Sequence, residues 1–225
     1  DALRRGENLP VFECLMQRKD ASLFPVEINF TAVQDEDANM LYLQIVSRDV
    51  SERKDVESRL RFMAMNDALT GLPNRSYLYI HLAQSFQQAL NTNSRVAVLY
   101  LDLDGFKKIN DTFGHEEGDQ FLVKIGQKLK ACLRNRDFVA RVGGDEFIVI
   151  VEDLHKPQFA AQIAQKILTQ IAQQINIKNH SMQITTSIGI SIFPDDGDRV
   201  EHIIQHADQA MYQVKGQHKN GYQFF

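Results

Sequence analysis

A short polar run between two mostly apolar runs constrains this chain more than any other feature of its sequence. Residues 138–142 and 147–151 are largely apolar, and between them stand Gly143, Gly144, Asp145 and Glu146. This pattern predicts a β-hairpin, because glycine supplies the backbone freedom that a tight turn needs. The glycines also let another molecule approach the turn closely. Asp145 and Glu146 are therefore expected to project from a rigid tip.

A second set of carboxylates follows another apolar run. Residues 96–101 are apolar and lead into Asp102 and Asp104, with Leu103 between them. If the ends of the two strands lie side by side, their oxygens form a cluster suited to Mg²⁺ or Mn²⁺, which keeps some water and coordinates substrate phosphates. This layout is typical of a nucleotidyl-transfer site. Taken alone, an acidic turn is usually a solvated loop.

Composition limits the partners and the compartment. The chain has 225 residues, 44% of them hydrophobic, and a net charge of -4 at pH 7. That charge gives no support for binding to nucleic acid or to a membrane surface. Cys14 and Cys132 are far apart and lack metal-site spacing, which suits a reducing cytoplasm. No apolar run approaches the ~20 residues of a transmembrane helix, although a membrane anchor could exist outside this piece.

The first 66 residues predict a small β unit and a helix. Apolar runs at 11–16, 23–33 and 40–47, separated by polar turns, indicate an antiparallel meander. So short a unit buries too little surface to be stable as an independent domain. In the charged segment 51–66, the residues Val56, Leu60 and Met63 would line one helical seam. A simple connector and a signalling helix that pairs with a partner chain both fit this pattern.

The rest of the chain alternates between helical and strand patterns. Helices are expected at 76–91, 106–112, 117–134, 157–175 and 200–214, and strands at 95–103 and 182–193, with the hairpin at 138–152. Strands that alternate with helices, together with one antiparallel hairpin, predict an α/β (α+β) sandwich.

Five blocks of this region, in order, resemble the GGDEF family of diguanylate cyclases. The resemblance covers residues 67–225, and its blocks lie at 67–75, 102–119, 141–147, 187–189 and 207–212. It implies a ferredoxin-like palm, similar to that of polymerases and nucleotide cyclases. It also implies that two GTP molecules are condensed into cyclic di-GMP, with release of two pyrophosphates.

The N-terminal region is similar to a second family. Residues 18–27 and 48–54 resemble the C-terminal half of a PAS sensor domain, although Ala21 stands where that family usually has glycine. The expected organisation is a PAS-like portion at 1–48, a signalling or linker helix at 49–66 and a GGDEF domain at 67–225. Because the resemblance covers only one half of a PAS domain, it implies neither a ligand nor a cofactor for the sensor.

The GGDEF resemblance also implies roles for individual residues. Asp102, the carbonyl of Leu103 and Asp145 would hold the metal, and Asp145 with Glu146 would help deprotonate the 3′-hydroxyl. The implied catalytic set is Asp145, Glu146 and Lys107, and the implied substrate-binding set is Gly105, Phe106, Lys107, Asn110, His115, Asp119, Gly143, Lys215 and Lys219. Asn110 and Asp119 would select guanine, since a carboxylate accepts from the N1 and N2 donors of that base. His115 fits a ligand contact and a packed or solvated histidine equally well.

The resemblance further implies regulation and assembly. Arg134 and Asp137 match the family's RxxD motif, which binds cyclic di-GMP as an inhibitor, although a charged helix end would give the same letters. Two GTP molecules must face each other, so a homodimer is expected for catalysis. Two other functions stay open: a silent module that binds GTP or cyclic di-GMP, and a cyclase of the adenylate type that acts on one nucleotide.

Overall fold

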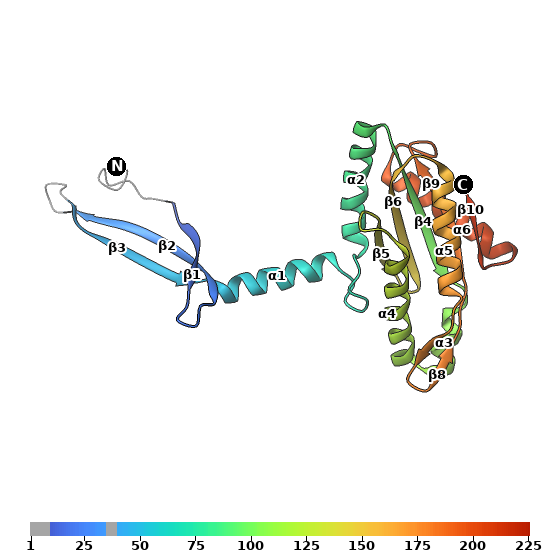
Figure 1. Ribbon diagram of the computed structural model, residues 1–225, viewed down its shortest axis with the longest axis horizontal. Coiled ribbons are helices and arrows are strands. Elements are labelled where there is room, and N and C mark those ends of the chain that lie inside the picture. Colours follow the sequence, from blue (N-terminus) through green and yellow to red (C-terminus); the bar gives the residue numbers. More distant parts are fainter. Residues whose placement is uncertain (1–9, 35–39) are drawn as a thin grey trace. The chain divides into compact units, whose positions relative to one another are not determined.

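The computed structural model describes residues 10–34 and 40–225 and divides into two compact units, Asp1–Phe62 and Met63–Phe225. Figure 1 labels most of the helices and strands of both units. In the described part of the chain, none of the helices combines the length and apolar character required to span a bilayer.

The first unit contains the predicted meander. Strands β1 (Phe12–Gln17), β2 (Leu23–Gln34) and β3 (Met40–Asp49) pair antiparallel in that order. Most of the turn expected at 34–39 lies outside the described residues. Helix α1 (Ser51–Met65) begins directly after Val50, which is buried and whose N–H donates to the Pro25 carbonyl at 3.1 Å. The helix itself has no buried residue, and its seam residues Val56, Leu60 and Met63 are exposed.

The second unit is built on a five-stranded mixed sheet. It runs through α2 (Arg75–Thr92), β4 (Arg95–Leu103), α3 (Phe106–Phe113), α4 (His115–Cys132), β5 (Phe138–Gly143), β6 (Glu146–Leu154), α5 (Pro157–Ile171), β7 (Ile175–Ile177), β8 (His180–Met182), β9 (Thr186–Phe193), α6 (Val200–Gln217) and β10 (Gly221–Phe224). The sheet order is β10-β9-β4-β6-β5, in which only β9 and β10 are parallel. From β4 to β9 this is the βαββαβ arrangement of a ferredoxin-like fold, as predicted.

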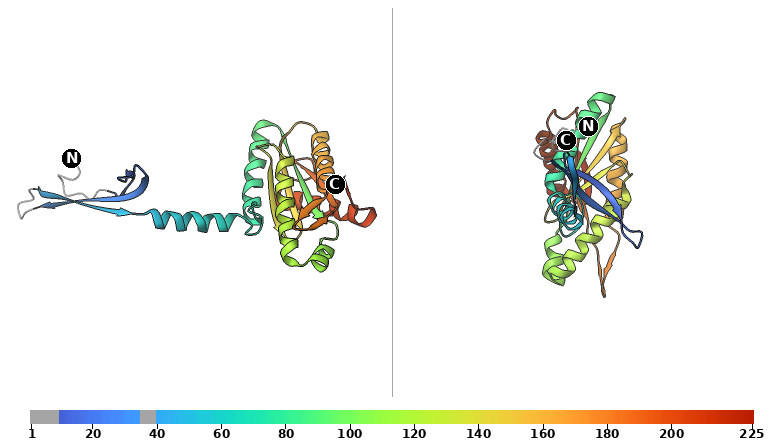
Figure 2. Two further views of the ribbon diagram at one scale, coloured as in Figure 1. Left: turned by 60° about the horizontal axis from the view of Figure 1, so that its bottom comes forward. Right: turned by 90° about the vertical axis from the view of Figure 1, so that its left-hand side faces the viewer.

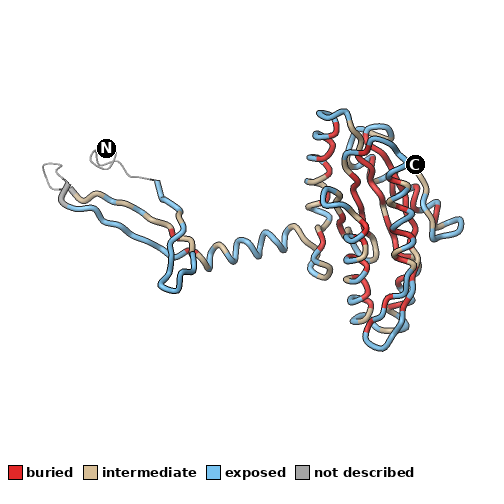
Figure 3. Tube along the Cα trace, in the orientation of Figure 1, coloured by how far each residue is buried: buried red, intermediate tan, exposed pale blue. Residues whose placement is uncertain are grey.

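Each face of the sheet carries its own hydrophobic core. One core joins the sheet to α3, α4 and α5, and the other joins it to α2 and α6. Figure 2 shows helices on both sides of the sheet, and in Figure 3 the buried positions concentrate on the strands and on the helix sides that face them. Central β4 is almost wholly buried, because helices cover both of its faces.

The structure corrects several predicted boundaries. The helix expected at 157–175 ends at Ile171, and the strand expected at 182–193 begins only at Thr186. Between them lies a small separate hairpin of β7 and β8, which the sequence analysis did not anticipate. Strand β10 was also missed, because four residues at the end of the chain give too short a pattern for periodicity to detect.

Helix α6 lies unusually close to β9, and Gly189 makes this possible. A Cβ atom at Gly189 would lie 1.9 Å from the Ala207 carbonyl oxygen and 2.2 Å from the Met211 backbone nitrogen. Both neighbours are backbone atoms, so no side-chain rotation can relieve the overlap.

We expect Gly189→Ala to lower the free energy of unfolding by about 3 kcal/mol or more, because α6 must shift away from the sheet. Thermal unfolding followed by circular dichroism measures this loss. Gly216→Ala is the matched control on α6, since a Cβ there meets nothing within 4 Å, and it should be neutral or slightly stabilising. Equal melting temperatures for the two variants would contradict this interpretation of the packing.

Candidate functional site

The predicted carboxylates meet at the end of β4. Asp102 is the register partner of Glu146 on β6, so their side chains share the face of the sheet covered by α2 and α6. The Leu103 N–H donates to the Asp145 carbonyl at 3.3 Å, which brings the β5–β6 turn against the end of β4. The side-by-side arrangement of the two strand ends is therefore present.

Burial and like charge act together on these carboxylates. Burial raises the pKa of Asp102, and the Asp145 and Asp104 carboxylates raise it further, whereas Lys215 lowers it. The pKa of Glu146 is raised by burial and then by Asp102. A site where several carboxylates are gathered out of water favours a bound cation.

The oxygen donors of this site suit a hard divalent ion. Two carboxylates, Asp102 and Asp145, and the Leu103 carbonyl fit the ligand preference of Mg²⁺ or Mn²⁺. Within residues 10–34 and 40–225, no group of three or more His, Cys, Asp or Glu side chains is arranged to hold a metal ion. Any ion held here would therefore complete its coordination with water or substrate oxygens.

The two lysines near the end of the chain that belong to the implied substrate-binding set occupy different positions. Lys215 on α6 places its Nζ 2.5 Å from Asp102 Oδ2, so it is paired with a predicted metal ligand. Lys219 is exposed and lies in the turn after α6. The next residue, Asn220, donates its N–H to Asp104 Oδ2 at 3.2 Å, which fixes this turn near the end of β4.

Asp104 does not belong to the oxygen cluster that the sequence pattern suggested. Its carboxylate accepts hydrogen bonds from the hydroxyls of Thr185 and Ser187, each at 2.7 Å, as well as from Asn220. The residue lies just beyond β4, where the chain turns toward the start of β9. Asp104 therefore joins three segments and is occupied by protein donors.

Helix α3 begins where substrate phosphates were predicted to bind. Gly105 has a φ of 83°, a conformation that favours glycine, and it precedes the first turn of α3. Lys107 is exposed on this turn, but the Phe106 side chain is buried in the core. Only the backbone of Phe106 can therefore serve a ligand directly.

The predicted guanine-selecting residues lie on two helices in close contact. Asn110 is on α3 and Asp119 is on α4, and the helices meet at Gly118, where a Cβ would lie 1.8 Å from Asn110 Oδ1. His115, predicted in the loop, is instead the exposed first residue of α4. The sequence analysis placed the start of this helix two residues too late, because Gly114 was treated as the start of a longer break.

Arg141 connects the glycine turn with Asp67. Its Nη1 lies 2.9 and 3.1 Å from the two carboxylate oxygens of Asp67, while Nε and Nη2 donate to the Gly144 carbonyl at 2.9 and 2.8 Å. Its side chain is only 12% exposed. Gly144 has a φ of 46°, so the turn needs both its glycine and this guanidinium. Gly143 and Gly144 themselves are exposed, as a site for close approach requires.

Asp67 is prepared for this contact by its own turn. Burial acts to raise the pKa of Asp67, but hydrogen bonds from Thr70 and Arg141 outweigh it and hold that pKa below its ordinary value. Thr70 donates to Asp67 Oδ1 through its N–H at 2.8 Å and its hydroxyl at 2.6 Å. The carboxylate is therefore charged and oriented toward Arg141.

The same block also contacts the end of α1. Asn74 donates its side-chain amide to the Ala64 carbonyl at 2.9 Å and its N–H to the Met65 carbonyl at 3.0 Å. Its Oδ1 accepts from the Tyr77 N–H and so begins α2. Residues 67–75 thus connect the end of the linker helix with the turn that carries Asp145.

Tyr100 is a site residue that the sequence analysis missed. It lies two positions before Asp102 and therefore on the same face of β4. Burial raises the pKa of its phenol, and the Glu146 carboxylate raises it further through charge and a hydrogen bond. Tyr100 and Glu146 line a small cavity of about 60 Å³ together with Arg75 and Tyr79. The period-2 alternation of β4 was the available signal.

The predicted inhibitory pair lies in a turn. Helix α4, expected to extend to residue 134, ends at Cys132, so both residues follow the helix. Asp137 Oδ2 accepts from the Arg134 N–H at 3.0 Å, while Asp137 Oδ1 is buried and has no donor among residues 10–34 and 40–225. Both residues line a pocket of about 300 Å³ with Lys130 and Phe138.

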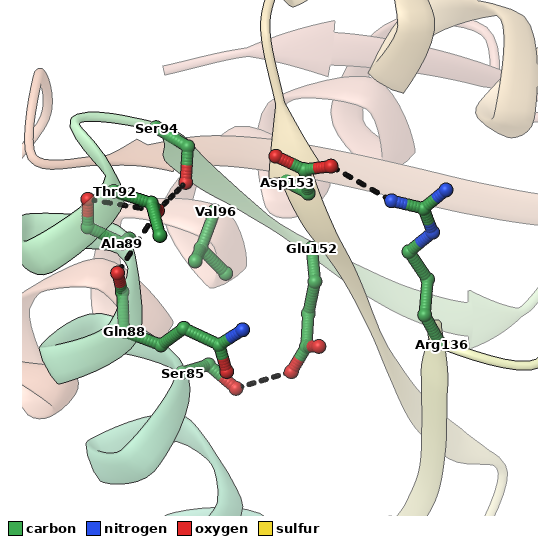
Figure 4. Close-up of a pocket in the computed structure, with 9 residues that line it drawn as sticks. All are labelled: Ser85, Gln88, Ala89, Thr92, Ser94, Val96, Arg136, Glu152 and Asp153. Atoms are coloured by element: carbon green, nitrogen blue, oxygen red, sulfur yellow. Dashed lines mark hydrogen bonds and ion pairs between the residues drawn. The ribbon is translucent and has the colours of Figure 1, made fainter.

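Another pocket lies at the end of the sheet opposite Asp102, where β4 begins and β6 ends. It has a volume of about 420 Å³ and is shown in Figure 4. Two polar contacts lie across it, from Ser85 to Glu152 and from Arg136 to Asp153, the latter at 2.7 Å. None of the residues predicted for catalysis or binding lines this pocket.

Comparisons with known proteins agree with the geometry. The family model described as "Diguanylate cyclase, GGDEF domain" matches residues 64–221. The bifunctional diguanylate cyclase/cyclic di-GMP phosphodiesterase MucR of Pseudomonas aeruginosa is 44% identical over 163 residues, which are 72% of this chain and 24% of that protein. The chain thus spans about a quarter of the length of this relative.

Solved structures show the same fold. The GGDEF domain of TpbB (YfiN) from Pseudomonas aeruginosa is 35% identical with a TM-score of 0.69, and the match covers 71% of this chain and 93% of that one. The GGDEF domain of DgcB from Caulobacter crescentus, solved in complex with c-di-GMP, is 27% identical with a TM-score of 0.67, over 72% and 93% of the two chains. On this agreement of sequence, fold and site, the chain belongs to the GGDEF family of diguanylate cyclase domains.

Proposed function

We propose that this chain condenses two GTP molecules into cyclic di-GMP and two pyrophosphates. The observation that supports this most is the meeting of Asp102, Asp145 and Glu146 at one end of the sheet, beside Lys215. Each carboxylate needed for the chemistry is present. Family membership alone supports only a cyclase domain of cyclic di-GMP signalling.

The reaction requires positioning and charge control more than covalent work by the protein. The 3′-hydroxyl of each GTP attacks the α-phosphate of the other, and the bond from that phosphorus to the bridging oxygen breaks as pyrophosphate leaves. The hydroxyl proton passes to the Asp145 or Glu146 carboxylate. When bound, Mg²⁺ or Mn²⁺ would neutralise charge on the triphosphate, and Asp102, the Leu103 carbonyl and Asp145 would hold the ion.

The remaining site residues would bind and orient the nucleotide. The backbone after Gly105 and the Lys107 cation would receive phosphate oxygens. Lys215 is placed to exchange the Asp102 carboxylate for a phosphate. Asn110 and Asp119 would recognise the guanine edge between α3 and α4.

Catalysis would need two chains. One domain supplies one GTP site, and the two nucleotides must face each other about a two-fold axis. The exposed residues Val56, Leu60 and Met63 on α1 follow helical spacing and would form the seam of a paired helix. The β meander before them would act as part of a PAS-like sensor, and the location would be cytoplasmic.

Asp145→Ala should reduce cyclic di-GMP formation by at least ~100-fold, because it removes a metal ligand and a candidate proton acceptor together. The assay incubates the chain with Mg²⁺ and either GTP or ATP and separates the products by chromatography. Asp198→Ala is a control for loss of an acidic side chain, since Asp198 is largely exposed and remote in the sequence from every predicted site residue.

The wild-type chain should convert GTP and leave ATP unchanged. Turnover by Asp145→Ala close to that of the control would remove the basis for this assignment. Cyclic GMP as the main product would favour a cyclase that acts on one nucleotide.

Product inhibition is the second part of the proposal. The Asp137 carboxylate lines this pocket and would accept from the N1 and N2 donors of guanine, and Arg134 is exposed beside it as a phosphate or guanine partner. Cyclic di-GMP bound in this pocket could hold two domains apart, which is inhibition through a second site.

Arg134→Ala should weaken inhibition by added cyclic di-GMP by about 10-fold or more, in line with the loss of a charge-assisted hydrogen bond, while initial turnover of GTP is kept. Arg136→Ala is a matched control, because Arg136 pairs with Asp153 at 2.7 Å and lines the other pocket. Inhibition that is equally potent in wild type and both variants would mean that the product competes at the active site.

A further inference from the structure

The small hairpin of β7 and β8 is firmly anchored at its base. Ile175, Ile177 and Met182 are buried in the core between the sheet and α4 and α5. The two strands pair through three residues each, from Ile175 opposite Met182 to Ile177 opposite His180. The tip residue Lys178 has a φ of 49°, a conformation that turns the chain sharply at this point. Lys178 is therefore presented from a rigid support.

The hairpin contacts both helices at the α3–α4 elbow, the junction at Gly114 where α3 ends and α4 begins. Lys178 Nζ lies 2.8 Å from Glu117 Oε1 and 3.0 Å from Glu116 Oε1, in the first turn of α4. The His180 ring lies 5.1 Å from the Phe113 ring, centroid to centroid, at the last residue of α3. In Figure 1 the hairpin lies at the same end of the domain as α3.

The start of α4 depends on contacts of this kind. Its N-cap residue is Gly114, which has no side chain that could cap the helix. Two acidic residues in the first turn suit the helix dipole, and a cation that holds both of them fixes the direction in which the helix leaves the elbow. Glu117 is the more enclosed partner, with 18% of its side chain exposed against 75% for Glu116.

This elbow carries the residues that would read guanine. Asp119 is one turn of α4 beyond Gly114, and Asn110 is held against Gly118 so closely that a Cβ at Gly118 would lie 1.8 Å from its Oδ1. A small shift of α4 would therefore move Asp119 and disturb Asn110 together.

We propose that Lys178 is a positioning residue for guanine recognition, acting through Glu116 and Glu117. This inference rests on the proposed function, since it assigns the guanine contacts to Asn110 and Asp119. Lys178 does not touch the nucleotide. Its effect should appear in the binding of guanine and not in the chemical step.

Lys178→Ala should raise KM for GTP by about three- to fivefold, a size set by two exposed ion pairs, and leave kcat unchanged. The preference for GTP over ITP, which lacks the 2-amino group, should fall by a similar factor. Lys178→Arg should restore most of both values. In a chain that carries Glu116→Gln and Glu117→Gln, Lys178→Ala should have no further effect, because its partners are no longer charged.

Lys128→Ala provides the matched control. Lys128 is on α4, the helix that Lys178 contacts. Its Nζ donates to the Gln170 carbonyl at 2.9 Å and so connects α4 with α5. This variant should lower the melting temperature as much as Lys178→Ala does and leave KM unchanged. An unchanged KM in Lys178→Ala, a fall in kcat at constant KM, or an equal rise of KM in Lys128→Ala would each overturn the proposal.

The inference and the proposed function fail in different ways. If the wild-type chain makes no cyclic di-GMP, the proposed function fails, and calorimetric binding of a non-hydrolysable GTP analogue replaces KM. Weaker binding in Lys178→Ala than in Lys128→Ala would then still support the role of Lys178. Absence of guanine-nucleotide binding by the wild-type chain would defeat both.

Discussion

The geometry of the site depends on one largely enclosed guanidinium, that of Arg141. Arg141 binds the Asp67 carboxylate on one side and the Gly144 carbonyl on the other, and it does so with little exposure to solvent. A guanidinium can make both contacts at once because its donors are planar and point in fixed directions. The turn that carries Asp145 is rich in glycine and would otherwise be free to move. Arg141 therefore converts a flexible turn into a fixed support for the Asp145 and Glu146 carboxylates.

The sheet provides the second constraint, since it sets where the fixed turn lies. Because β4 and β6 pair antiparallel, the end of one meets the beginning of the other, and Asp102 comes opposite Glu146. Cores on both faces of the sheet hold this register, since a slip by one residue would send Asp102 to the opposite face. The block 67–75 then connects the turn to the end of α1 through Asn74.

Local patterns predicted the fold class, the hairpin and the carboxylate cluster, because each depends on residues close in sequence or on strand periodicity. They failed where long-range contacts decide the outcome. Asp104 is occupied by Thr185 and Ser187, more than 80 residues away, and Lys215, far along the chain on α6, is paired with Asp102. Asp67 and Arg141 lie in two of the blocks that resemble the GGDEF family, but neither block by itself predicts that the two residues are in contact. The hairpin of β7 and β8 was missed because its strands have only three residues each.

A double-mutant cycle tests the central role of this contact most directly. The rate of cyclic di-GMP formation is measured for wild type, Asp67→Ala, Arg141→Ala and the double variant, with thermal unfolding to confirm that each is folded. If Asp67 acts by holding Arg141 on the turn, each single variant should lose about 10-fold or more, and the double variant should lose little beyond Arg141→Ala alone. Losses that multiply, or single variants with full activity, would contradict this account.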